Sequence, residues 1–99
     1  MKQVIVLYGK PADSTAFDRH YAETHVPLVH RMPHLKGFRY SKGEVKSSDA
    51  QNAPYMVATL DYADEADLAA SLASPEGQDA VADVAAFASG GVTILTVTF

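Results

Sequence analysis

Both ends of the chain carry short runs that would be hydrophobic on both faces of an extended strand. Val4–Tyr8 is apolar throughout, and Val92–Phe99 has apolar side chains at both odd and even positions. The β-branched residues in both runs favour strands. Gly9 and Pro11 follow the first run and Gly90-Gly91 precede the second, which marks the strand boundaries. Because such strands need cover on both faces, they constrain the chain to a sheet that is packed on each side.

Helical and extended patterns alternate between these two ends. Asp13 or Ser14 can cap an amphipathic helix that we expect to run to about Met32, where Pro33 disfavours helical geometry. Asp64 can cap a second helical region, which restarts at Ser74-Pro75-Glu76 and stops at Gly90-Gly91. The strands are expected at 4–8, 35–45, 55–61 and 92–99, with a polar loop over 47–53 that has no periodicity.

The resulting order, β-α-β-β-α-β, predicts an α+β, ferredoxin-like fold of one domain spanning residues 1–99. Its four-stranded antiparallel sheet would carry both helical regions on one face. The other face has no cover within the chain, although the terminal strands place apolar side chains there. Since soluble monomers rarely expose a large apolar patch, we expect a homodimer in which two sheets face each other.

The charge and the amino-acid composition exclude several classes of binding partner. The net charge is −4 with neutral histidines, Lys and Arg are scattered, and there is no cysteine. These features argue against nucleic acid, an anionic membrane surface, a disulfide framework and a thiolate metal site. No run is long enough to span a bilayer and no targeting signal is evident, so a cytoplasmic protein is expected.

The stretch from Phe17 to Met32 contains the candidate site. At about 100° per residue, its inward stripe spans roughly 80° and consists of Phe17, Tyr21, His25, Leu28 and Met32. Tyr21 and His25 are four residues apart, so their side chains can meet. Pro27 cannot donate to the carbonyl of Glu23 and predicts either a kink or a break, with Pro27 starting a second short turn.

His25 has two interpretations. As a partly buried histidine with a lowered pKa, it would be a neutral general base at physiological pH. Alternatively, it is a structural residue whose ring is hydrogen-bonded to a carbonyl freed by Pro27. His20 lies on the flank of the stripe, about 140° from His25, and no acidic residue shares the stripe, so no metal site is predicted.

Several residues resemble the EthD family, a branch of the dimeric α/β-barrel proteins. The matching features are Phe17, His20-Tyr21, His25-Val26-Pro27-Leu28, Leu35-Lys36-Gly37 and Tyr40, with a weaker match at Ser74-Pro75-Glu76-Gly77 and Phe87. The resemblance covers nearly the whole chain and implies a dimeric α/β barrel. It also implies a role in small-molecule breakdown or secondary metabolism. EthD itself is associated with an oxygenase system that degrades ethers, and relatives include cofactor-free monooxygenases, lactone isomerases and polyketide cyclases.

The resemblance implies His25 as the acid/base residue, with Tyr21 and Tyr40 as candidate partners, of which Tyr21 is the catalytic candidate. Other polar residues are candidates for binding a small hydrophobic or aromatic substrate: Tyr8, His20, Tyr40 and Tyr55. No phosphate loop, nucleophile elbow or nucleotide fingerprint is present, so a cofactor-free oxidoreductase, isomerase or cyclase is expected. The alternative is a non-catalytic dimer that binds a small hydrophobic ligand as an accessory to an oxygenase.

Overall fold

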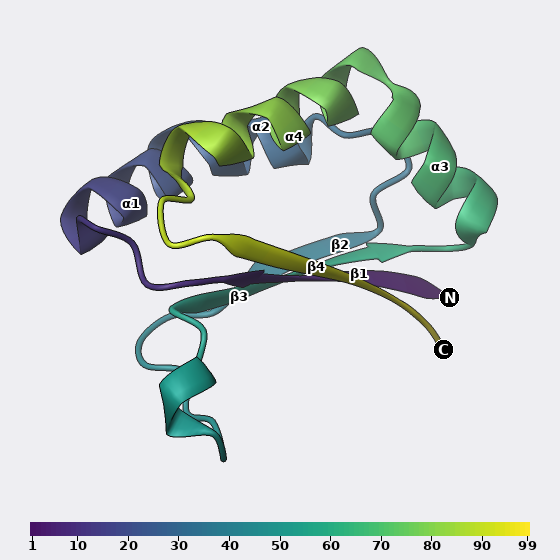
Figure 1. Ribbon diagram of the computed structural model, residues 1–99. Helices are drawn as coiled ribbons and strands as arrows, with labels where there is room; N and C mark the ends of the chain where they lie inside the picture. Colours follow the sequence, from purple (N-terminus) through teal and green to yellow (C-terminus); the bar gives the residue numbers. More distant parts are fainter.

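The computed structural model describes all 99 residues and has the predicted element order. A four-stranded sheet of order β2-β3-β1-β4, antiparallel throughout, carries every α-helix on one face (Figure 1). The predicted α+β, ferredoxin-like arrangement is therefore confirmed. The elements are β1 (Lys2–Tyr8), α1 (Ser14–His20), a π-helical turn η1 (Tyr21–His25), α2 (Val26–His30), β2 (Gly37–Tyr40), a 3₁₀ turn η2 (Ala50–Asn52), β3 (Met56–Tyr62), α3 (Glu65–Ala73), α4 (Pro75–Phe87) and β4 (Val92–Thr98).

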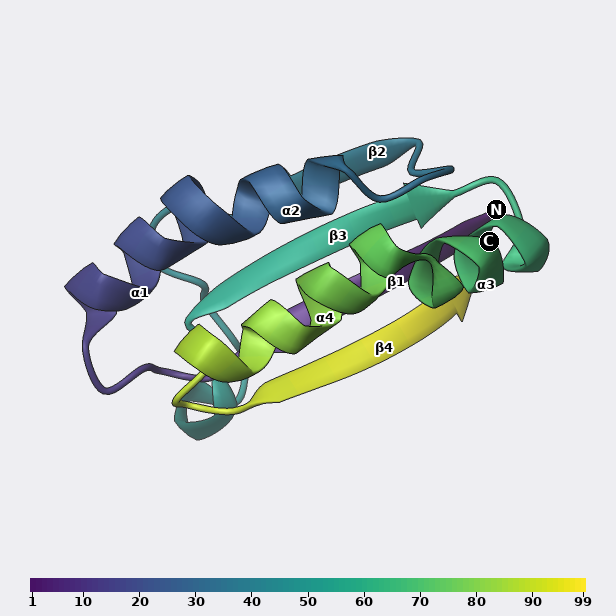
Figure 2. The same ribbon diagram turned by 90° about the horizontal axis from the view of Figure 1, so that it is seen from above.

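The core lies between the sheet and the helices. Along β1 and β3 buried residues alternate with half-buried ones, as expected when only one face is covered. Seen from above, α4 lies over β1 while β4 lies to one side of it (Figure 2). The helix-facing side chains of β4 are consequently exposed, and Ile94 keeps 56% of its surface.

Local signals place the helix starts where the sequence predicted them. The Asp13 side chain accepts a hydrogen bond from the Ala16 amide, and Asp64 and Ser74 cap α3 and α4 in the same way. The first helical region ends at His30 rather than Met32. At Pro27 the helical backbone continues without a break, because the π-helical turn η1 precedes it and Pro27 lies in the first turn of α2.

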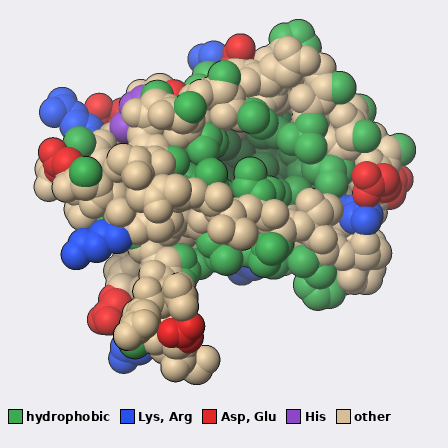
Figure 3. All heavy atoms as spheres, in the orientation of Figure 1, with side chains coloured by type: hydrophobic (Ala, Val, Ile, Leu, Met, Phe, Trp, Pro, Cys, Tyr) green, Lys and Arg blue, Asp and Glu red, His purple; other side chains and the backbone are tan.

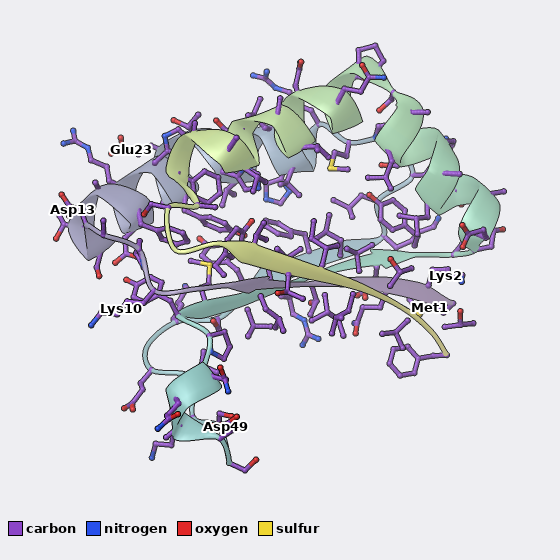
Figure 4. All side chains as sticks on the ribbon, viewed as in Figure 1. Met1, Lys2, Lys10, Asp13, Glu23 and Asp49 are labelled. Atoms are coloured by element: carbon purple, nitrogen blue, oxygen red, sulfur yellow. The ribbon has the colours of Figure 1, made fainter.

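Strand β2 is shorter than predicted, because it covers 37–40 instead of 35–45. The Ser41 hydroxyl accepts a hydrogen bond from the Val57 amide at 2.9 Å and so ends the ladder with β3. The chain then leaves the sheet on the face opposite the helices, where Asp49 marks the segment in Figure 4. The loop expected over 47–53 contains the short turn η2, and β3 begins at Met56 rather than Tyr55. None of the helices is long and apolar enough to cross a membrane.

Candidate functional site

A π-helical turn places two histidines on one side of the first helical region. The Val26 amide donates to the carbonyl of Tyr21, five residues earlier, directly before Pro27. Pro27 lacks the N–H that an α-helix would use, and a wider turn accommodates that loss. Residues five apart are then close to one full turn apart, so His20 and His25 converge. The predicted separation of 140° is wrong because it assumed an unbroken α-helix.

Both histidines contact one carboxylate on α4. His25 Nδ1 lies 3.0 Å from Asp83 Oδ2, and His20 Nε2 lies 2.9 and 3.0 Å from the two Asp83 oxygens. A carboxylate accepts hydrogen bonds, so the proton of neutral His25 is on Nδ1 and its Nε2 carries the lone pair. Nε2 makes no hydrogen bond and is not fully enclosed. Asp83 therefore fixes the tautomer that leaves Nε2 available as a base.

The environment keeps His25 neutral. Its side chain is 6% exposed, and burial lowers the pKa of His25 from its ordinary value of 6.5. The hydrogen bond and the negative charge of Asp83 raise the pKa in part, but burial has the larger effect. Lowering of this pKa was expected from the sequence, whereas a carboxylate partner was not.

Tyrosine side chains pack beside the ring of His25. The ring centroid of Tyr21 lies 5.2 Å from that of His25, which confirms the predicted contact, and Tyr8 packs edge-on against Tyr21. Burial raises the pKa of Tyr8 to about 12 and that of Tyr21 well above its usual range, so both hydroxyls keep their protons. The Tyr21 hydroxyl is fully buried, and its polar neighbour is the Tyr8 hydroxyl, which contributes to the raised pKa of Tyr21.

These groups line an apolar cavity of about 220 Å³ between the sheet and the helices. Tyr8, Tyr21 and His25 supply polar atoms at its buried side, and most of the other lining residues are hydrophobic. Figure 3 shows the hollow, lined by hydrophobic side chains, in the view where α4 lies above and β4 below. No Lys, Arg, Asp or Glu side chain lines it.

The other predicted site residues do not line this cavity. Tyr40 and Tyr55 line a second, larger pocket of about 770 Å³ beside the segment over 41–55, and Tyr21 forms part of the wall of both pockets. The Tyr55 hydroxyl donates to Asp18 at 2.7 Å. His20 lines neither pocket, and its ring stacks on Phe87. The structure thus places Tyr8, Tyr21 and His25 on one cavity. Tyr40 packs against Tyr21 from outside it, with ring centroids 5.0 Å apart, and His20 reaches the site only through the shared Asp83 carboxylate.

Asp83 is the functional residue that sequence reasoning missed. It lies 58 residues from His25 along the chain, so no local pattern links the two. One signal was available: Asp83 is four residues before the buried Phe87 on α4 and therefore shares its inward side. The structure has no group of three His, Asp or Glu side chains arranged to hold a metal ion.

The fold and the cavity together define a class: ferredoxin-like α+β proteins with a histidine at an apolar pocket between sheet and helices. The family model for the EthD domain matches residues 10–91, and the chain belongs to this family. A relative from Rhodococcus erythropolis, an uncharacterized 11.0 kDa protein in the thcB-thcC intergenic region, is 48% identical over 97 residues. That match covers 96% of this chain and 91% of the relative.

Solved structures agree with the family and the fold. An ethyl tert-butyl ether d (EthD) family protein from Bacillus halodurans superposes with a TM-score of 0.89 at 29% identity, covering 100% of this chain and 98% of that one. A dimeric ferredoxin-like protein of unknown function from Thermobifida fusca gives 0.73 at 14% identity, with 99% and 90% covered. SnoaB, a cofactor-independent oxygenase from Streptomyces nogalater, gives 0.65 at 14% identity, with 99% and 90% covered. The last two matches show the fold alone.

Replacing Asp83 tests the electrostatics of the site. Because the Asp83 carboxylate raises the pKa of His25 against the effect of burial, Asp83→Asn is expected to lower that pKa further. Titration of the His25 ring signals by NMR measures the change. Asp79→Asn, an exposed acid one turn earlier on α4, is the matched control and should leave the pKa unchanged. An unchanged or higher pKa in Asp83→Asn would contradict the assigned contact.

Proposed function

We propose that the protein is a cofactor-free enzyme in which His25 moves a proton on a small oxygenated or aromatic substrate bound in the 220 Å³ cavity. One observation carries this proposal. The ring of His25 is held at Nδ1 by Asp83, lines the cavity, and leaves Nε2 without a partner. A general base needs one free lone pair, and Nε2 of His25 carries one.

The surrounding groups suit proton abstraction from a phenol, an enol or a carbon next to a carbonyl. His25 Nε2 takes the proton, and the negative charge of Asp83 stabilises the imidazolium that forms. The Tyr21 hydroxyl, which keeps its proton, can donate a hydrogen bond to the substrate oxygen as charge develops there. The same step begins an isomerisation or a cyclisation, or an oxygenation in which molecular oxygen is the oxidant.

A ligand screen followed by turnover tests this proposal. A panel of phenols, enolisable ketones and lactones is first tested for thermal stabilisation of the protein, and each ligand found is incubated with substoichiometric protein. We expect product by mass spectrometry, and kcat/KM should rise with pH as His25 loses its proton, at a pH below 6.5. His25→Gln should reduce turnover by at least about 100-fold, the lower end of what a positioned base contributes.

The exposed His30 supplies the control for that substitution. His30→Gln removes a histidine of the same helical region that lies outside both pockets, so turnover should stay at the wild-type level. Full turnover in His25→Gln with an unchanged melting temperature would refute the base. Thermal stabilisation by ligands without any product would instead favour the accessory role, in which the dimer only binds a small hydrophobic molecule.

We also propose that two copies pack sheet to sheet. The face of the sheet away from the helices presents apolar side chains at its centre, among them Ile5, Leu7 and Leu95, and Leu95 keeps 44% of its surface exposed. Polar residues surround them, including Gln3, which donates to Asp61 at 2.8 Å. An apolar centre with a polar rim is the usual anatomy of an interface.

A charge at the centre of that face should separate the copies. We expect wild-type protein to have the mass of two chains by light scattering after size exclusion, and Ile5→Lys to have the mass of one, because a lysine buried between two apolar faces would have no ion-pair partner. Ala82→Lys places the same charge on the exposed side of α4 and should leave the mass unchanged. A wild-type protein with the mass of one chain would overturn the proposed dimer.

A further inference from the structure

The cavity has two chemically different ends. Its buried end carries Tyr8, Tyr21 and His25, whose exposed fractions are between 1% and 4%. Its open end lies between α4 and β4, where Val81 and Ile94 keep 55% and 56% of their surfaces, and Leu72 at the end of α3 keeps 44%. The hydrophobic lining visible in Figure 3 therefore continues from the cavity to the molecular surface.

The volume of the cavity limits the size of the ligand that fits inside it. At about 30 Å³ for each water-sized group, 220 Å³ holds roughly seven non-hydrogen atoms, which is the size of phenol. Any larger ligand must extend through the opening, and most of the surface that it meets there is apolar, with Thr96 as the one polar lining residue on β4. A hydrocarbon chain leaving the cavity would remove side chains such as Val81 and Ile94 from water.

The cavity also discriminates by charge. No cationic side chain lines it, and the Asp83 carboxylate lies directly behind His25. A carboxylate or phosphate brought to the buried end would be desolvated without a counter-charge and repelled by Asp83. A neutral hydroxyl or carbonyl can instead form hydrogen bonds with His25 Nε2 and the Tyr21 hydroxyl.

We infer that the site takes neutral amphiphilic molecules head first, with the oxygen-bearing group against His25 and Tyr21 and a hydrocarbon chain leaving between α4 and β4 over Val81 and Ile94. This assignment of substrate class and orientation rests on the proposed function, because it places the reacting oxygen at the base. Chain length beyond the phenol-sized head then sets affinity, while the head sets reactivity.

Calorimetric titration with phenol, 4-ethylphenol, 4-butylphenol and 4-hexylphenol tests the orientation. Wild-type affinity should rise about two- to fourfold for each added methylene, and 4-hexylbenzoate should bind at least about tenfold more weakly than 4-hexylphenol. Ile94→Ser and Val81→Ser should flatten the rise for the longer chains. Val92→Ser, on the same side of β4 but outside the cavity lining, should keep the wild-type rise.

Several results would overturn this inference: no binding of any alkylphenol, an affinity independent of chain length, an equal rise in Ile94→Ser, or equal binding of the benzoate. These outcomes are separable from failure of the proposed function. If the chain-length effect is absent while His25→Gln still abolishes turnover, only the orientation is wrong. If the chain-length effect holds and is lost in Ile94→Ser while His25→Gln retains turnover, the orientation stands and the catalytic role of His25 falls.

Discussion

The site depends on one carboxylate that joins two helical regions. Asp83 on α4 accepts hydrogen bonds from His20, which directly precedes the π turn, and from His25, which is its last residue. One turn further along α4, Phe87 packs against both imidazole rings, with centroid distances of 5.1 and 4.9 Å. A buried carboxylate is stable only when its acceptors are satisfied, so α4 is fixed relative to the π turn. The direction of the His25 ring follows from that docking.

The same docking determines where the protein is open. Because α4 lies over β1, the helix-facing side of β4 has no cover, and an apolar cavity opens there instead of a filled core (Figures 2 and 3). A low-polarity pocket strengthens each electrostatic interaction inside it, including that between Asp83 and an imidazolium at His25. The fold thus supplies an apolar cavity, a fixed tautomer of His25 and a protonated hydroxyl at Tyr21.

Much of the architecture was predictable because its signals are local. The side chains of Asp64 and Ser74 cap helices by accepting hydrogen bonds from backbone amides three residues later. The apolar runs at both ends of the chain, hydrophobic on both faces, predict strands. The contact between Tyr21 and His25 followed from their spacing of four residues. The relation of His20 to His25 did not, because a π turn changes the angle per residue. Asp83 was missed because tertiary packing alone brings α4 to the histidines.

The site requires a neutral His25 at physiological pH with its proton on Nδ1. Nitrogen-15 NMR of the imidazole side chains, recorded at pH 7 as two- and three-bond correlations to the ring carbon-bound protons, measures the protonation of each nitrogen directly. We expect a protonated Nδ1 and an unprotonated Nε2 for His25, because Asp83 accepts from the first and nothing within the protein binds the second. A proton on Nε2 alone, or on both nitrogens, would contradict the assignment of His25 as a base held ready by Asp83.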